Sequence, residues 1–346
     1  NLAEATRREA RTVRSLVGMT DVSTLAKFEV TGPDAASFLE KICATSVARL
    51  APGRGRYTFM LREDGLVCDD GTVWRLEENR YLLTSSTGGA DRMATVLSYA
   101  RQVLLPEMRV SVVNVQEHYA GIAVAGPQAS AVVAALTGAE APRHMGLARA
   151  IIAGTPVLVL AASYSGERAF EIYVEGTSAA AVWTACEDEV LGRDGCLYGL
   201  EAMEVLRIEK GHVVVGGEVD MRRTPHELGL GGMVNKAGGF IGEMGMKRPS
   251  HGEAHRLFLV GLEATSGTIP EGSMLMKKHN RPAEGHVTAS AYRALEGGSI
   301  ALALLADGAN RHGEELLAFS PTRKQQASVR VTAPHFYDPQ GTRYRD

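Results

Sequence analysis

Two neighbouring carboxylates interrupt a strand-like run of apolar residues. Asp69 and Asp70 follow Val67 and precede Val73. Because side chains alternate along a strand, one of the two acids must face the buried side. A carboxylate in apolar surroundings is costly unless it is paired or used, and a positioned carboxylate can hold or move a proton. The pair therefore indicates a functional site, or else a structural aspartate at a strand kink beside Gly71.

A third carboxylate, Glu171, occupies the matching place in a second hairpin. Asp70 lies five residues after the turn glycine Gly65, and Glu171 lies five residues after Gly166. If the two hairpins pack about a pseudo-twofold axis, the acids lie at equivalent places on two second strands. The spacing predicts one site to which both hairpins contribute a carboxylate.

The elements that would position these acids form an internal repeat. An alternating strand, a Gly-Pro pair and a helical pattern occur at 28–42 and again at 122–136. Pro suits the first helical turn, where its missing N–H is not needed. Each copy continues with a hairpin (57–62 with 66–76; 157–162 with 169–174) and a helix (90–104; 177–191). The order predicts two ferredoxin-like βαββα units, at about 25–115 and 119–215. The alternative is that Gly-Pro after a strand is only common punctuation.

The last third of the chain changes character. A glycine- and charge-rich stretch, 211–228, reads as a loop around the site or a domain junction. Short strands separated by glycine turns then run from 256 to 332, which predicts a small β-barrel. We therefore expect an α+β fold, in which duplicated units (1–247) are followed by a C-terminal β-barrel (248–333) and a loose tail (334–346).

Composition narrows the class of function. The chain has 346 residues and a formal net charge of −3, which argues against nucleic acid or an anionic membrane as the main partner. It contains no apolar run of about 18 residues and no signal peptide pattern. Its four cysteines show no CxxC spacing, which predicts reduced thiols in a cytoplasmic protein. No dinucleotide or Walker motif is present, and the scattered histidines do not form the H-E-x-x-H metal motif. The start at Asn1, without methionine, fits a piece of a larger polypeptide as well as it fits a disordered end.

Three segments resemble the glycine-cleavage T-protein (aminomethyltransferase) superfamily. They are the hairpin 57–70, the block 206–211 with 216–220 and 224–225, and the segment 285–290. Within that superfamily the sequence most resembles the folate-binding C-terminal region of the heterotetrameric sarcosine oxidase α subunit, through 13–34, 60–71, 84–91 and 205–211. The resemblance implies tetrahydrofolate as the cofactor of the domain 1–247.

The resemblance also implies roles for individual residues. Asp70, or its neighbour Asp69, would be the catalytic acid near the reactive nitrogens of the pterin. Glu171 would accept hydrogen bonds from the amino-pyrimidine edge, because a carboxylate can accept two parallel N–H donors. Tyr164 would pack near the pterin. The remaining cofactor-binding assignments implied by the resemblance are Tyr57, Met60, Thr84, Ser85, Arg207 and Lys236.

Two departures from the family pattern affect the expected cofactor contacts. Thr84 and Ser85 occupy the strand in which T-proteins carry an asparagine. The arginine that grips the folate glutamate tail in T-proteins falls at Met203, so Lys236 or the Arg222–Arg223 pair would have to hold the tail.

The resemblance implies a one-carbon step in an amine demethylase. Flavin- and NAD-binding subunits would oxidise an N-methyl amine, and this chain would capture the iminium or formaldehyde as 5,10-methylenetetrahydrofolate. Two alternatives remain open. One is a folate-dependent methyltransferase or demethylase that acts without a flavin partner. The other is a non-enzymatic folate-binding assembly module.

Overall fold

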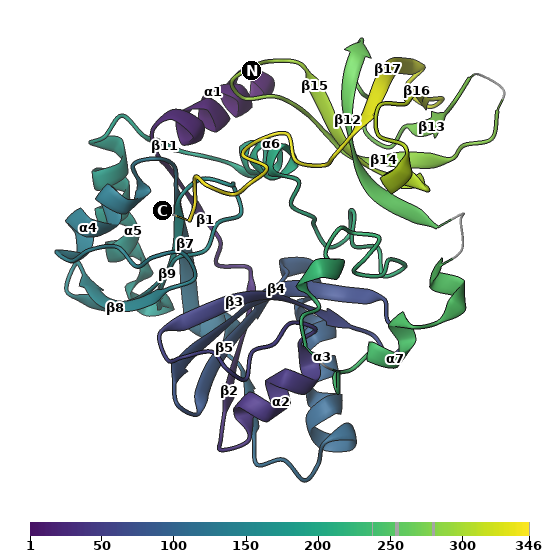
Figure 1. The fold of residues 1–346 in the computed structure, drawn as a ribbon. Helices are drawn as coiled ribbons and strands as arrows, with labels where there is room; N and C mark the ends of the chain where they lie inside the picture. Colours follow the sequence, from purple (N-terminus) through teal and green to yellow (C-terminus); the bar gives the residue numbers. More distant parts are fainter. Residues whose placement is uncertain (237, 253–255, 279–280, 346) are drawn as a thin grey trace.

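The computed structural model describes residues 1–236, 238–252, 256–278 and 281–345. Two mixed units lie side by side, and a barrel follows them (Figure 1). None of the described helices is both long and apolar enough to cross a lipid bilayer. Within the described residues, no cluster of His, Cys, Asp and Glu side chains suits a metal ion. The four cysteines are free thiols, and Cys43, Cys68 and Cys186 are buried.

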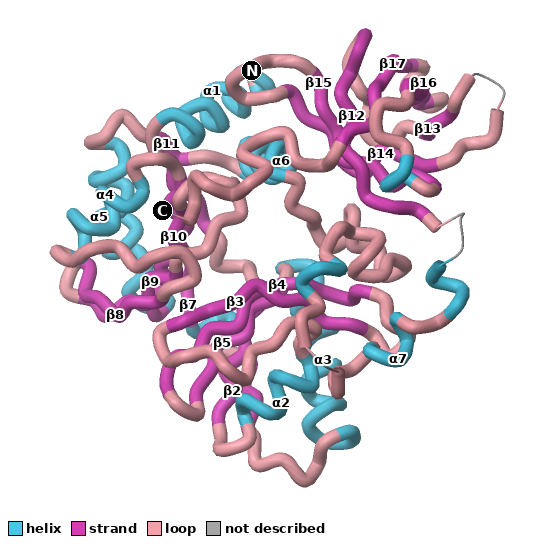
Figure 2. The backbone as a smooth tube through the Cα atoms, in the orientation of Figure 1, coloured by secondary structure: helices cyan, strands magenta, loops and turns pink. Residues whose placement is uncertain are grey.

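The first unit is a five-stranded sheet with helices on one face (Figure 2). The strand order is β3-β4-β5-β2-β6. Buried apolar side chains such as Phe28, Leu39 and Leu83 fill the space between the sheet and its helices. The elements are β2 (Ala26–Thr31), α2 (Ala35–Ile42), β3 (Arg54–Leu61), β4 (Val67–Glu77), β5 (Arg80–Ser85), η1 (Thr87–Gly89), α3 (Ala90–Tyr99), η2 (Ala100–Leu104) and β6 (Ser111–Asn114).

The second unit repeats this plan. Its sheet has the order β11-β1-β7-β10-β9-β8, and one strand, β1, comes from before the first unit. A core that includes Val124, Val132 and Phe170 packs under its helices. The elements are β1 (Gly18–Asp21), η3 (Gln116–His118), β7 (Tyr119–Ala125), α4 (Ala129–Thr137), β8 (Leu147–Ile152), β9 (Thr155–Leu160), β10 (Ala169–Glu175), η4 (Gly176–Ser178), α5 (Ala179–Leu191) and β11 (Cys196–Leu197).

The duplication is present, but its repeated part has four strands in each unit, one more than the three of the predicted βαββα unit. The order β3-β4-β5-β2 in the first sheet corresponds to β8-β9-β10-β7 in the second. The sequence reading overlooked β8, and it did not count β5 as a strand of the first unit. The predicted equivalence of Asp70 and Glu171 is therefore wrong. Asp70 lies on β4, whereas the register counted from Gly32 and Gly126 places Glu171 on β10 at the position that Leu82 holds on β5.

The two Gly-Pro turns are equivalent, as the repeat predicted. Gly32 and Gly126 have φ angles of 125° and 136°, which a residue with a side chain rarely adopts. A Cβ at Gly32 would lie 2.3 Å from the carbonyl oxygen of Arg109, and one at Gly126 would lie 2.5 Å from that of Leu16. Both turns thus need glycine, because the chain passes directly against them.

The sheet faces that the helices leave uncovered pack against each other. Apolar side chains from both sheets form one cluster there: Trp74, Leu76, Leu82, Leu158, Leu160 and Tyr173. Because alternate residues share a face, this contact fixes which side chains of β4, β5 and β10 point between the units.

The C-terminal part forms the predicted barrel. Its closed strand order is β12-β15-β14-β13-β16-β17. Helix α6 contacts both α1 and the barrel strand β14 (Figure 1). The barrel strands are β12 (Leu257–Ser266), β13 (Met274–Met276), β14 (Gly285–Tyr292), β15 (Ser299–Ala306), β16 (Glu315–Ser320) and β17 (Gln325–Thr332). The remaining elements of the chain are α1 (Leu2–Ser15), α6 (Leu200–Lys210), η5 (Gly231–Met233), α7 (Glu243–Met246), η6 (Pro249–Gly252) and η7 (Gly308–Asn310).

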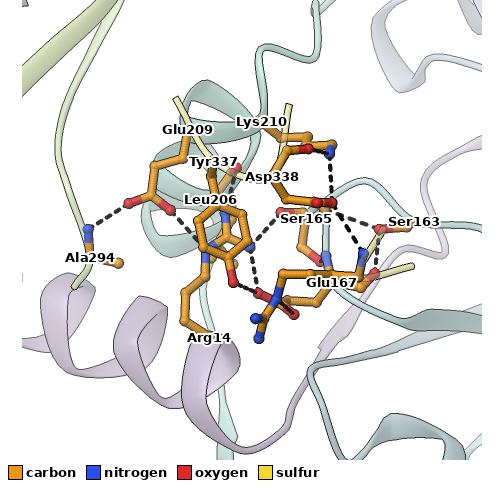
Figure 3. A network of polar contacts seen from close by, with 12 residues as sticks. Arg14, Ser163, Ser165, Glu167, Leu206, Glu209, Lys210, Ala294, Tyr337 and Asp338 are labelled. Atoms are coloured by element: carbon orange, nitrogen blue, oxygen red, sulfur yellow. Dashed lines mark hydrogen bonds and ion pairs between the residues drawn. The ribbon is translucent and has the colours of Figure 1, made fainter. Parts of the chain in front are cut away.

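The tail after the barrel is docked, contrary to the expectation of a loose end. Its anchor is Arg14, whose side chain is fully buried and pairs with Glu167 at 3.2 Å and with Glu209 at 2.8 Å (Figure 3). Tyr337 of the tail donates a hydrogen bond to Glu167, and the Arg14 guanidinium lies 3.8 Å from the Tyr337 ring centre. Lys210 binds Asp338 of the tail in the same network. The tail is therefore held by polar contacts with buried charged groups, Glu167 and Lys210.

Removing Arg14 should destabilise the whole chain. Arg14→Ala leaves two buried carboxylates without this cation, and breaking such a pair costs about 3–5 kcal/mol. Arg11→Ala, on the same helix but exposed, is the control and should change the free energy of unfolding by less than about 0.5 kcal/mol. Denaturant unfolding followed by circular dichroism measures both. Equal stabilities of the two variants would contradict the central place of Arg14.

Candidate active site

Strand alternation sends Asp69 and Asp70 to opposite faces of the first sheet. Asp69 is fully buried on the helix-covered face, where it accepts hydrogen bonds from the Ser86 amide and hydroxyl at 3.0 and 3.1 Å. Asp70 points to the uncovered face, where the Tyr57 hydroxyl donates to its Oδ2 at 2.7 Å. Of the two acids, Asp70 therefore faces the space between the units.

A row of polar side chains crosses the uncovered face from β3 to β2. Tyr57 pairs with Thr72, and Thr84 pairs with Lys27, in the strand register. The hydroxyls of Thr72 and Thr84 are 2.7 Å apart, and the Trp74 indole donates to Thr72 at 2.7 Å. The Thr84 hydroxyl is thus hydrogen-bonded within this row of polar side chains. The row leads from the Asp70 region toward the second sheet.

Glu171 extends this row onto the second sheet. Tyr173, on the same face of β10, donates to Glu171 at 2.6 Å. Burial raises the pKa of Glu171, while the Tyr173 hydrogen bond and the nearby Lys27 ammonium oppose the shift. Lys27 lies 5.0 Å from the Tyr173 ring centre and donates to the carbonyls of residues 23 and 25. Burial lowers the pKa of Lys27 to about 8, although the Glu171 charge opposes it.

Tyr164 comes to the site from the loop between β9 and β10. Its ring stacks on His212 with the ring centres 5.7 Å apart, and its hydroxyl donates to the Val213 carbonyl at 3.3 Å. Burial raises the pKa of Tyr164, and the charge of Asp70 contributes to the shift. Tyr164 also raises the pKa of Tyr57 by a smaller contribution, after burial and Asp70. Asp70, Tyr57 and Tyr164 therefore form one group.

The carboxyl of Asp70 titrates near neutral pH. Burial raises its pKa to about 7, the Tyr57 hydrogen bond opposes this, and the charge of Asp69 adds to it. A group with such a pKa can hold and release a proton under ordinary conditions. Strongly shifted acids are typical of functional sites.

Arg207 stabilises the elements around the site through ion pairs with other side chains. Its side chain is buried and pairs with Glu218 at 2.9 Å and with Glu204 at 2.6 Å. Glu218 also accepts hydrogen bonds from the Val214 amide at 3.0 Å and from Thr288 of the barrel at 2.5 Å. Arg207 thus ties α6 to the loop after it and to β14, and its contacts are with protein groups.

Three other predicted residues do not place their side chains beside Asp70 on the uncovered face. Met60 is buried in the helix-covered core of the first unit. Ser85 is buried too, with a hydroxyl that has no partner in the described part of the chain. The ammonium of Lys236 binds the carbonyls of Glu40 and Cys43 at the end of α2. Lys236 therefore acts as a cap of that helix, while Met203 packs in the cluster between α1 and α6.

Sequence reasoning missed Lys27, Thr72 and Tyr173. Thr72 and Tyr173 could have been found by following alternation from Asp70 and Glu171, since residues two apart in a strand share a face. The missing signal was the pairing of β2 with β5, which brings Lys27 beside Thr84.

A separate surface pocket of about 870 Å³ opens between β2, the start of α3 and η3. None of the predicted site residues lines it. Its charged residues Glu29 and Arg80 pair with each other at 2.6 Å. We place the chemistry at Asp70, because the carboxyl with a near-neutral pKa is there.

Comparisons with known proteins agree with this architecture. The family model for the GCVT N-terminal domain matches residues 1–238, and that for the glycine cleavage T-protein C-terminal barrel domain matches residues 258–338. A solved structure of the glycine cleavage system aminomethyltransferase T from Bartonella henselae shares the fold. It has a TM-score of 0.86 and 24% identity, over 99% of this chain and 91% of that one.

Curated relatives fall into two groups. The sarcosine oxidase subunit alpha of Rhizobium meliloti is 35% identical over 98% of this chain, but only 36% of that protein is covered. The aminomethyltransferase of Exiguobacterium sibiricum is 31% identical over 97% of this chain and 90% of its own length. The chain thus spans about a third of the sarcosine oxidase relatives it matches.

The raised pKa of Asp70 has a consequence for stability. Between about pH 4 and pH 7 the native chain keeps a proton that the unfolded chain has released, so stability falls as pH rises. Asp70→Asn removes this titration and keeps an oxygen for Tyr57. We expect the difference between the melting temperature of Asp70→Asn and that of the wild type to rise by about 2 °C or more from pH 5 to pH 8.

Thermal unfolding followed by circular dichroism at both pH values measures the gain. Asp188→Asn, at an exposed position of α5, is the control, and its melting temperature should differ from that of the wild type by the same amount at both pH values. A constant difference between Asp70→Asn and the wild type would show that Asp70 does not titrate in this range.

Proposed function

The chain belongs to the glycine cleavage T-protein family, and we propose that it binds tetrahydrofolate between its two units and places a one-carbon unit on it. Aminomethyltransferases and sarcosine oxidase alpha subunits of this family bind tetrahydrofolate, so the predicted cofactor is confirmed for the family. The positions of the cofactor contacts in this chain are our proposal.

The residues on the uncovered faces fit such a cofactor. Tyr173 is the one hydrogen-bond donor to Glu171 among the described residues, so one oxygen of that carboxylate remains free to accept. The same holds for Asp70, whose Oδ2 is engaged by Tyr57. Two half-buried carboxylates with spare acceptors suit a ligand with several N–H donors, and the amino-pyrimidine edge of a pterin has them. Glu171 would hold this edge.

Tetrahydrofolate, when bound, supplies nucleophilic nitrogens that accept a one-carbon unit. Asp70 would take up and return the proton that is exchanged in that step. Because Tyr57 donates to Oδ2, Oδ1 is the oxygen that would carry the proton. The ionised form of Asp70 would also stabilise a cation beside it. Tyr57 and Tyr164 would hold the carboxyl and the ligand in place.

We propose that the one-carbon donor is an N-methyl amine oxidised by other subunits. The observation that favours this is the 35% identity to the sarcosine oxidase alpha subunit of Rhizobium meliloti over nearly the whole chain. Flavin- and NAD-binding parts would lie outside these 346 residues, and the product would be 5,10-methylenetetrahydrofolate. The free cysteines are consistent with a reducing compartment such as the cytoplasm.

A second candidate is the aminomethyltransferase of a glycine cleavage system. The observation behind it is the 31% identity to the aminomethyltransferase of Exiguobacterium sibiricum over 97% of this chain. Met203, which resemblance places where T-proteins carry an arginine, disfavours it. Product formation from an aminomethyl-lipoyl protein would decide for this candidate, and product formation only with an amine-oxidising partner would decide for the first.

Loss of Glu171 should weaken cofactor binding. Glu171→Ala should lower the affinity for tetrahydrofolate at least about tenfold, because the N–H donors of the pterin lose a charged acceptor. Glu175→Ala, at the exposed end of the same strand, should bind like the wild type. Fluorescence titration of the folded chains measures both. Equal binding by Glu171→Ala and the wild type would reject the assignment of Glu171.

Loss of the Asp70 carboxylate should uncouple one-carbon transfer from amine oxidation. In the complex with its oxidising partners, Asp70→Asn should slow the formation of 5,10-methylenetetrahydrofolate about 100-fold, a typical contribution of one acid–base group. Oxygen uptake should continue, with free formaldehyde as the product. Full methylenetetrahydrofolate production by the variant would reject the catalytic role.

A further inference from the structure

The buried neighbour of the proposed catalytic acid has an unusually complete set of partners. Asp69 accepts hydrogen bonds from the Ser86 amide and hydroxyl, from the Asp70 amide at 2.9 Å and from Arg92 Nη2 at 3.2 Å. In three of these contacts the partner can only donate. Burial raises the pKa of Asp69, and the hydrogen bonds from Ser86 and Asp70 and the charge of Arg92 oppose this shift by favouring the ionised carboxylate.

The site of Asp69 is built closely around it. A Cβ at Gly89 would lie 1.5 Å from the Asp69 Oδ2, and a Cβ at Gly71 would lie 1.9 Å from the Thr84 carbonyl oxygen. Gly89 lets the start of α3 approach Asp69, and Gly71 lets β4 approach β5. The carboxylate thus lies beside Gly89 at the start of α3, where the helix dipole favours negative charge.

Asp69 is linked to Asp70 through one peptide unit. The Asp70 amide donates to Asp69 Oδ1, which fixes the backbone at the point where the Asp70 side chain leaves the strand. Arg92, whose side chain is about one-third exposed, lies on the far side of Asp69 and balances its charge. Across the sheet, the Arg92 guanidinium is therefore followed by the Asp69 carboxylate and then by the Asp70 carboxyl, which faces the space between the units.

We propose that Asp69 and Arg92 are positioning residues that set the proton affinity of Asp70: Asp69 fixes its backbone and places a negative charge behind it, and Arg92 limits the effect of that charge. The importance of this pair for catalysis rests on the proposed function of Asp70, but the electrostatic coupling itself does not.

The charges around Asp70 give each change a definite sign. The groups that act on Asp70 are Tyr57 from β3, Tyr164 from the loop between β9 and β10 and, from the opposite face of its own strand, the charge of Asp69. A negative neighbour disfavours ionisation of a carboxyl. Without the Asp69 charge, Asp70 should release its proton at lower pH. Without Arg92, the Asp69 charge is unbalanced and Asp70 should hold its proton to higher pH.

The test follows the Asp70 carboxyl directly by ¹³C NMR on the chain without cofactor, with the signal assigned by its loss in Asp70→Asn. Arg92→Ala should move the titration midpoint up by about half a pH unit or more, and Asp69→Asn should move it down by at least as much. Arg92→Lys, which keeps the charge, should stay near the wild type. Arg109→Ala, which removes an exposed arginine and the same net charge, should not move it.

Opposite shifts in Arg92→Ala and Asp69→Asn support the proposal, because a merely structural loss would not give opposite signs. If Asp69→Asn fails to fold, the upward shift in Arg92→Ala and its rescue in Arg92→Lys carry the test. Midpoints that stay within about 0.2 pH unit, or that move in the same direction, overturn it. If the midpoints shift as stated but the pH dependence of methylenetetrahydrofolate formation does not follow, the coupling stands and the catalytic role of Asp70 fails.

Discussion

The buried guanidinium of Arg14 is the contact on which the arrangement of the chain depends. It joins the N-terminal helix to Glu167 in the second unit and to Glu209 on α6. Glu209 in turn accepts from the Ala294 amide in the barrel region, and its carbonyl accepts from the Tyr337 amide of the tail. A buried charge is tolerated only when it is paired and hydrogen-bonded, so these segments must assemble together. The loop that carries Tyr164 and the helix that carries Arg207 are held in place by this network, and both border the proposed site.

The alternation of side chains along β4 gives the adjacent residues Asp69 and Asp70 different surroundings. Asp69 is turned toward the helices, where Ser86 and Arg92 satisfy it. Asp70 is turned toward the second unit, where burial raises its pKa to about 7. The apolar contact between the sheets keeps water from part of this face, and the row from Tyr57 to Lys27 supplies its polar groups. A pterin-sized ligand would therefore meet carboxylates from both units.

The amino-acid sequence predicted the fold class, the duplication and the barrel, because glycine turns and apolar periodicity record local backbone geometry. It also singled out Asp70 and Glu171, since carboxylates are rare in apolar strands. It failed where long-range pairing decides. The strand β8 was missed, so Glu171 was matched to Asp70 and not to Leu82. Lys236 was expected to hold a ligand, yet it caps α2, because a helix 200 positions earlier lies beside it. The tail was expected to be loose, yet Tyr337 meets the buried Glu167.

The most direct test is the crystal structure of this chain with a stable reduced folate, such as 5-formyltetrahydrofolate. We predict that the amino-pyrimidine edge will bind the free oxygen of Glu171 and that the reactive nitrogens will face Asp70 rather than Asp69. Binding with the pterin away from both carboxylates, or in the surface pocket that Glu29 and Arg80 line, would contradict the account.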